Sequence, residues 1–212
     1  MNMTLPTQAI ALTLVSAHEE LERAELYGLL AQLWLAPPDA AMLEQFAVAV
    51  TQAPQTGGHL EAPWQNLVAA IRATNVLAAG EEHDAMFHGV GKPEVFAYAS
   101  FYLSGFLNEK PLAVLRADLN TLGLTRDANR VETEDHVAYV FEVMRYLIAG
   151  DDAAVSNLEQ QRLFFRAHVQ SWVPMLCEAV LAHPRAQVWR AVATLTDAFV
   201  QVETQGFDLL ET

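Results

Sequence analysis

The segment VETEDH, residues 131–136, leads directly into the apolar run VAYVFEVMRYLI, residues 137–148. Apolar side chains recur in this run at the spacing of one helix face, namely Val137, Val140, Phe141, Met144, Leu147 and Ile148. The spacing predicts a buried helix whose first turn is crowded with acidic residues, with His136 among them. Ionisable side chains at the mouth of a buried helix are where we expect a functional site.

The same helical periodicity returns along most of the chain, and no stretch shows sustained alternation with a period of two residues. The pattern predicts an all-α fold. The predicted helices are one that ends at Pro37-Pro38, followed by residues 40–51, 64–79, 81–87, 96–106, 111–122, 137–148, 158–180 and 186–203.

Several boundaries of these helices rest on particular residues. Pro111 suits the first position of a helix, and Gly123 suits the position after its end. Ser156-Asn157-Leu158-Glu159 has the pattern of a capping box, which opens the long helix that follows. Pro174 within that stretch either kinks the helix or starts a new one.

The segment around residues 124–131 is polar and is the best candidate for a hinge. A chain of 212 residues is long enough for one large domain or two small ones. We therefore expect an N-terminal helical part, residues 1–123, and a C-terminal helical part, residues 132–212, which either pack as one domain or form two helical subdomains joined by the hinge.

Composition excludes some classes of partner. The formal net charge is −14, from 26 acidic and 12 basic residues, and this balance repels nucleic acid and anionic membrane surfaces. The apolar run at residues 9–15 is too short to span a bilayer, so no stable membrane insertion is expected. The single cysteine, Cys177, cannot form an internal disulfide, which fits a cytoplasmic location.

Signs of catalysis are few. No Gly-x-Ser-x-Gly motif occurs, and Cys177 lies in an apolar helical pattern typical of a packing residue, so nucleophilic catalysis has little support. The alternative is a metal-dependent all-α hydrolase that uses His83 and Asp84. Such a site needs further ligands, for which His59 and Asp118 are poor candidates, and we predict neither a metal nor a cofactor.

The cluster before residue 137 has two interpretations. In the first, Thr133 caps the helix, and Glu134 and Asp135 lie at its positive end. In the second, the carboxylates form a recognition patch that pairs with arginine in a fork geometry, tuned by His136. The residue types alone favour the cap.

A stripe of aromatic residues runs through the predicted helix at 96–106. Tyr98 and Tyr102 lie four residues apart and would share one face, while Ser100 would lie on another. Such a stripe is more often part of a core than a platform for a ligand.

Together these residues resemble the TorD/DmsD/NarJ family of molybdoenzyme-specific chaperones. Glu132-x-x-Asp135-His136 is similar to the family motif Glu-Pro-x-Asp-His at the start of an apolar helix. Other segments agree in order and spacing. They are the Phe-x-Gly loop within residues 84–89, Pro93, the aromatic-x-Ser-x-aromatic segment at 98–102, and Phe165-x-x-His168-x-x-x-Trp172. The resemblance runs from about Tyr27 to Phe199.

The resemblance implies a cytoplasmic chaperone with a single helical-bundle fold and without catalytic turnover, so no enzyme and no catalytic residue are expected. Members of the family bind the twin-arginine signal peptide of a molybdopterin oxidoreductase and delay its export until the cofactor is inserted. By position, Asp135 and His136 would contact the signal peptide, supported by Glu132. Tyr98, Ser100 and Tyr102 would line the same groove.

The resemblance also implies either a monomer or a homodimer that exchanges domains at the hinge. Two positions depart from the family pattern. Thr133 stands where the family usually has proline, and Asn108-Glu109 stands where a glycine often follows the aromatic segment.

Overall fold

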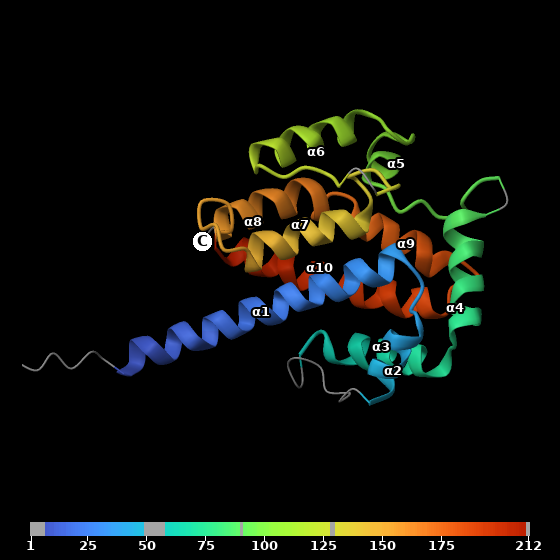
Figure 1. The fold of residues 1–212 in the computed structure, drawn as a ribbon, viewed down its shortest axis with the longest axis horizontal. Helices are drawn as coiled ribbons and strands as arrows, with labels where there is room; N and C mark the ends of the chain where they lie inside the picture. The colour runs from blue at the N-terminus through green and yellow to red at the C-terminus, as the bar shows by residue number, and fades with distance from the viewer. Residues whose placement is uncertain (1–6, 49–57, 90, 128–129, 211–212) are drawn as a thin grey trace, which may run out of the picture.

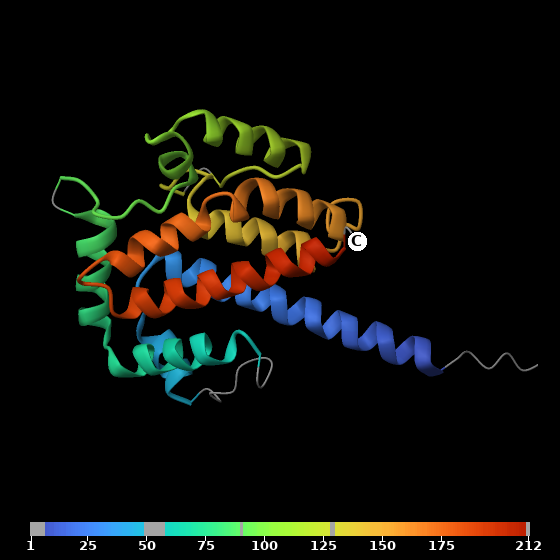
Figure 2. The same cartoon turned by 180° about the vertical axis from the view of Figure 1, so that it is seen from behind.

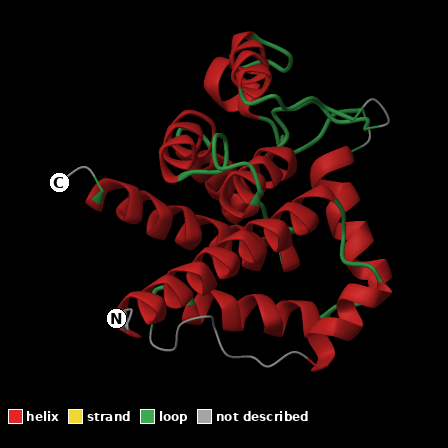
Figure 3. Cartoon of the chain, turned by 60° about the vertical axis from the view of Figure 1, so that its left-hand side comes forward, coloured by secondary structure: helices red, strands yellow, loops and turns green. Residues whose placement is uncertain are grey.

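The computed structural model describes residues 7–48, 58–89, 91–127 and 130–210. Within these ranges every regular element is a helix, which confirms the all-α prediction, and the only β-type pairing is an isolated bridge between Tyr98 and His136 (Figure 3). The α-helices are α1 (Thr7–Leu35), α2 (Ala40–Val48), α3 (Glu61–Ala73), α4 (Val76–His83), α5 (Ala99–Ser104), α6 (Lys110–Thr121), α7 (Val137–Ala149), α8 (Leu158–Phe165), α9 (Val173–Ala182) and α10 (Val188–Leu209). Two short π-helices, η1 (Asp84–His88) and η2 (Arg166–Gln170), follow α4 and α8.

The helices pack around one continuous apolar core. The long helix α1 packs along α7, and α10 packs against α9 and α3. In the two opposite views, α5 and α6 lie on one side of α7, whereas α2 and α3 lie on the far side (Figures 1 and 2). The largest fully buried side chains include Trp34, Trp172, Trp189, Tyr27, Phe141, Phe165 and Phe199.

This core joins helices from both sides of the predicted hinge. Helices α1 and α3 precede residues 124–131, whereas α7, α9 and α10 follow them, and all contribute to the same cluster of buried side chains. The division of the chain at 124–131 stays a prediction, and residues 128–129 of the segment lie outside the described ranges.

The predictions at Pro111 and Gly123 are confirmed. Helix α6 has Pro111 in its first turn, and Gly123 follows its end with a φ of 72°. Pro174 lies in the first turn of α9, so it starts a new helix rather than kinking a continuous one. The helix predicted at 40–51 is described only to Val48, because residues 49–51 lie outside the described ranges.

Three other boundaries differ from the prediction. The helix expected at 64–79 is two helices, because the side chain of Asn75 accepts a hydrogen bond from the Ala78 amide and so starts α4. Asn157 caps α8, rather than Ser156, whose hydroxyl donates instead to the carbonyl of Tyr146. Helix α5 begins only at Ala99, so the expected helix at 96–106 is much shorter.

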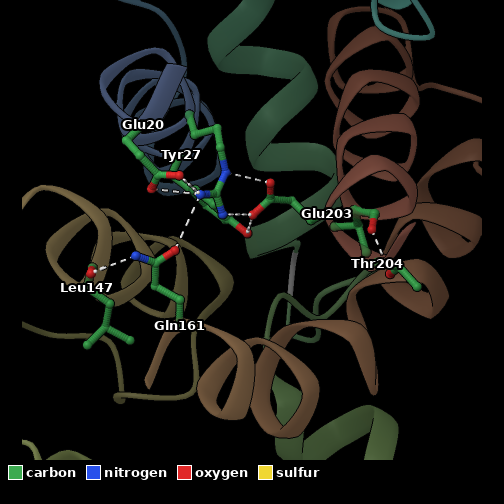
Figure 4. A network of polar contacts seen from close by, with 8 residues as sticks. Glu20, Tyr27, Leu147, Gln161, Glu203 and Thr204 are labelled. Atoms are coloured by element: carbon green, nitrogen blue, oxygen red, sulfur yellow. Dashed lines mark hydrogen bonds and ion pairs between the residues drawn. The ribbon is translucent and has the colours of Figure 1, made fainter. Parts of the chain in front are cut away.

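A buried ionic network fastens α1 to α10 (Figure 4). The guanidinium of Arg23 donates two hydrogen bonds to the carboxylate of Glu203, at 2.9 and 2.8 Å, and the hydroxyl of Tyr27 donates a third at 3.0 Å. Arg23 also reaches Glu20 and the side-chain oxygen of Gln161. The amide of Gln161 donates in turn to the carbonyl of Leu147, so the network reaches α8 and α7.

None of the helices in the described part of the chain is both long and apolar enough to cross a bilayer. Cys177 is buried on α9, as expected for a packing residue, and burial raises the pKa of its thiol well above the ordinary value.

Replacing Glu203 should destabilise the protein. Glu203→Ala leaves the largely buried charge of Arg23 and the hydroxyl of Tyr27 without their main acceptor, so we expect the free energy of unfolding to fall by about 3–5 kcal/mol. Urea denaturation followed by circular dichroism measures it. Glu178→Ala, on the exposed face of α9, is the matched control and should change the free energy of unfolding by less than about 0.5 kcal/mol. Equal effects of the two changes would contradict this role of the network.

Candidate functional site

Two segments that lie far apart in the sequence meet at the start of α7. The amide of Ala99 donates to the carbonyl of Asp135 at 3.0 Å, and the amide of Val137 donates to the carbonyl of Ala97 at 2.9 Å. These bonds form the antiparallel bridge between Tyr98 and His136. The turn at residues 132–136 is therefore held directly against the start of α5.

Asp135 is the centre of this junction. Its side chain is almost completely buried, and one carboxylate oxygen accepts hydrogen bonds from the amide of Ser100 at 3.0 Å and from its hydroxyl at 2.5 Å. The other oxygen accepts a bond from the hydroxyl of Thr133 at 2.6 Å. A buried carboxylate needs such partners, and here its acceptor sites are used within the chain. Asp135 thus fixes Ser100, which is fully buried, to the turn before α7.

His136 starts α7 rather than lying within its first turn. Its backbone is extended, and its Nδ1 accepts a hydrogen bond from the amide of Ala138 at 3.2 Å. The prediction that acidic residues occupy the first turn of this helix is therefore wrong, because they lie in the turn that precedes it. The predicted cap by Thr133 is also wrong, since its hydroxyl bonds to Asp135.

The imidazole of His136 is neutral at neutral pH. Burial lowers the pKa of His136 to about 4, although the nearby carboxylates of Glu132 and Asp135 oppose the shift and His83 adds to it. The ring lies edge-on to Tyr98, with centroids 5.0 Å apart. With Nδ1 accepting from the backbone, the proton of the neutral ring is on Nε2.

Tyr98 and Glu132 form the part of the cluster that is open to solvent. Both residues are partly exposed, and the hydroxyl of Tyr98 donates to the carboxylate of Glu132. Burial and the adjacent carboxylate raise the pKa of Tyr98 well above its ordinary value, so the phenol remains a donor.

Among the described residues, no hydrogen bond or ring contact joins Tyr102 to the other five predicted site residues. Its ring stacks on Trp172 with centroids 5.8 Å apart, and its buried hydroxyl has no hydrogen-bond partner among the described residues. The expectation that Tyr98 and Tyr102 share a helix face is wrong, because α5 begins at Ala99 and Tyr98 is extended. The structure thus brings together Tyr98, Ser100, Glu132, Asp135 and His136.

A groove of about 580 Å³ opens beside this cluster. Its walls come from α1, the end of α6, the segment after α6 and most of the length of α7. The turn contributes Glu134, and α7 contributes Tyr139, whose ring centroid lies 6.0 Å from that of His136. The other lining residues are Ala31, Gln32, Leu35, Leu119, Leu124, Thr125, Arg126, Asp127, Arg130, Ala138, Glu142, Val143, Arg145 and Tyr146.

Two arginines of the chain already pair with the carboxylate of Glu134 at the edge of this groove. Arg116 donates two hydrogen bonds to Glu134, at 3.0 and 2.8 Å, and Arg126 lies 3.8 Å from its other oxygen. Partial burial alone would raise the pKa of Glu134, but these partners hold it below its ordinary value. Arg126 also donates to the carbonyls of Arg130 and Glu132, which folds the segment after α6 onto the turn.

Sequence reasoning missed most of this groove. Its floor is built by α1 and α7, which are more than 90 residues apart, so no local pattern indicates it. The polarity of residues 124–131 is the available signal, and it predicts a hinge rather than the wall of a groove.

The ligands considered for a hydrolase do not converge in the described part of the chain. His83 and Asp84 lie at the junction of α4 and η1. A carboxylate oxygen of Asp118 is hydrogen-bonded to Nε2 of His168 at 2.7 Å, and His59 lines a separate hollow beside Arg23 and Glu203.

The buried histidine makes the stability of the protein depend on pH. The folded pKa of His136, about 4, lies below the ordinary value of 6.5, so between these values the unfolded chain binds a proton that the folded chain does not. The free energy of unfolding should therefore fall as the pH drops from 6.5 to 4, and the contribution of His136 to this fall is on the order of 3 kcal/mol. Above about pH 6.5 the contribution of His136 should not change with pH. Burial also lowers the pKa of His83 to about 4, which acts in the same direction.

Urea denaturation of the wild type and of His136→Asn between pH 4 and 8 checks this pH dependence. Asparagine can still cap α7 but does not titrate, so the variant should lose less stability than the wild type on acidification. His59→Asn, at an exposed position, should follow the wild type. Parallel curves for wild type and His136→Asn would show that His136 contributes nothing to the acid sensitivity.

Comparison with known proteins places these segments in a family. Residues 54–178 match the family model described as nitrate reductase delta subunit, and the match includes both segments that form the cluster. Two curated relatives, each named chaperone protein TorD, come from Vibrio cholerae serotype O1. The relative from strain ATCC 39315 / El Tor Inaba N16961 is 30% identical over 120 residues, and that from strain ATCC 39541 / Classical Ogawa 395 / O395 is 28% identical over 120 residues.

Each of these alignments covers 53% of this chain and 54% of the relative, so the chain spans about half the length of the curated relatives it matches. The family model covers more than half of the chain. On that match the protein belongs to the nitrate reductase delta subunit family, the TorD/NarJ family that its Glu132-x-x-Asp135-His136 motif resembles.

Proposed function

We propose that this protein is a chaperone for a molybdopterin oxidoreductase, which it binds through the twin-arginine signal peptide of that enzyme. The observation that carries the proposal is the family match, because it spans both segments of the Asp135 cluster and because the matched relatives are named chaperones. In this role the protein acts in the cytoplasm, performs no catalysis, and holds the client until its cofactor has been inserted.

The groove beside the cluster is the proposed binding place for the peptide. It combines apolar side chains of α1 and α7, such as Leu35 and Val143, with the carboxylates of Glu134 and Glu142. A signal peptide with consecutive arginines before an apolar stretch matches this combination, since carboxylates pair with guanidinium groups and apolar walls take aliphatic side chains. The net charge of −14 favours such a cationic segment over an anionic one.

Burial divides the proposed site residues into two roles. Ser100, Asp135 and His136 are buried and bonded within the chain, so in the proposal they hold the turn in shape and act on the peptide indirectly. Glu132 and Tyr98 are partly exposed, so they are within reach of a ligand. Tyr102, against Trp172, takes no direct part.

To bind in this groove, an arginine of the peptide must replace an arginine of the chain as the partner of a carboxylate. Glu134 already holds Arg116 and Arg126, and Glu142 holds Arg145 at 3.0 Å. An incoming arginine pair competes with these internal partners. The net gain for each new pair is therefore small, and apolar contacts with the groove supply the remainder of the affinity.

Titration calorimetry with a synthetic peptide tests the proposal. The peptide carries two consecutive arginines followed by the apolar stretch of a twin-arginine leader, and a second peptide has both arginines replaced by lysine. We expect one-to-one binding that weakens for the lysine peptide, because lysine cannot form the bidentate pair. Glu132→Gln and Glu142→Gln should each weaken binding of the arginine peptide by about 1–2 kcal/mol.

Glu178→Gln, on the exposed face of α9, is the control for the loss of one negative charge and should leave the affinity unchanged. Equal losses in all three variants would mean that only net charge matters, which would sink the site assignment. An absence of binding to either peptide at millimolar concentration would overturn the proposed function itself.

A further inference from the structure

The junction of α4 and η1 gathers three groups that can bind a metal ion. Ligand atoms of His83, Asp84 and His88 all lie within 4.8 Å of one another. Nδ1 of His88 is 2.9 Å from a carboxylate oxygen of Asp84, and Nδ1 of His83 is 3.8 Å from that same oxygen. These residues have no part in the groove proposed for the signal peptide.

A π turn is what places the two histidines on one side of the helix. Residues five apart in an α-helix are separated by about 140° around its axis, so His83 and His88 would point in different directions there. In η1 the amide of Gly89 bonds to the carbonyl of Asp84, five residues back, at 2.8 Å. The wider turn brings His88 round towards His83, and such turns are frequent at functional sites.

Gly89 fixes the end of this π turn. Its φ is +57°, and a Cβ atom at this position would collide with the carbonyl of Lys92. The backbone that follows is held by the carbonyl of Met86, which accepts hydrogen bonds from the amides of Glu94 and Val95. The turn is therefore built into the backbone and does not depend on a bound ligand.

His83 provides a second, independent sign of a ligand. Its side chain is 4% exposed and its ring packs against Phe87 and Trp189, with centroids 5.1 and 5.0 Å away. Its Nδ1 has no hydrogen-bond partner among the described residues, and the 3.8 Å to Asp84 is too long for one. Leaving a buried polar atom unpaired destabilises the folded state, and a ligand at this atom would offset that cost.

We propose that His83, Asp84 and His88 form a binding site for a divalent transition-metal ion of the zinc type. Two imidazoles with one carboxylate suit zinc and its neighbours, whereas calcium and magnesium prefer sites made of oxygen atoms. Bonds of about 2.0–2.2 Å in tetrahedral geometry separate ligand atoms by roughly 3.3–3.5 Å. The observed 2.9 and 3.8 Å bracket that separation, and the third pair, His83 and His88, lies within 4.8 Å.

The ion would fasten the π turn while remaining accessible. Asp84 and His88 are exposed, so at least one coordination position faces solvent and takes water. Glu82 is not available as a ligand, because its carboxylate accepts the amides of Gln187, Val188 and Trp189 at the start of α10. The site thus lies where α4 is already anchored to α10.

Zinc titration of untagged full-length protein, freed of metal by dialysis against chelator, tests this inference. Calorimetry should give one ion per chain, and Co²⁺ should give a visible absorption spectrum that zinc abolishes. His88→Ala and Asp84→Asn, both at exposed positions, should keep the helical content and lower zinc affinity at least tenfold, since even changes outside the ligand shell cost roughly 10- to 100-fold.

His59→Ala removes an exposed histidine elsewhere and should leave zinc affinity unchanged. The proposal would be overturned by zinc binding to the wild type that does not saturate, or by an unchanged zinc affinity in His88→Ala. A loss of zinc affinity in His59→Ala equal to that in His88→Ala would overturn it as well. Affinity for the arginine peptide is measured separately, so the outcome does not depend on the chaperone function.

Discussion

The buried carboxylate of Asp135 is the contact on which the candidate site depends. It joins Ser100 at the start of α5 to the turn before α7, across 35 residues of sequence, and two backbone hydrogen bonds reinforce the junction. Because the carboxylate is out of water, each of its bonds is stronger than a surface contact, and losing one leaves a costly unpaired group. The positions of Tyr98, Glu132 and His136 all follow from this junction.

The helices of the fold could be predicted where local rules decide the structure. The apolar face of Val137 to Ile148 predicts α7, and Pro111, Pro174 and Gly123 mark boundaries that the structure confirms. Predictions were wrong where a single polar side chain outweighed the periodicity. Asn75 divides one expected helix into α3 and α4 by capping the second.

The candidate site shows the same contrast. The sequence identified the cluster at 132–136 but placed its acidic residues inside α7, since nothing local reveals that His136 pairs with Tyr98 and begins the helix. It likewise treated Tyr98 and Tyr102 as one face, although α5 starts between them. His88 escaped notice because α-helical spacing separates it from His83, and only the π turn brings them together.

The proposed chaperone role assigns the reachable groups, Glu132 and Tyr98, to contact and the buried groups to support. Amide hydrogen exchange of the protein with and without the arginine-pair peptide tests this claim most directly. Binding in the groove predicts slower exchange in residues 130–146, which contain the turn and most of α7, with little change in α9. Slower exchange confined to α9 and α10, with residues 130–146 unaffected, would contradict it.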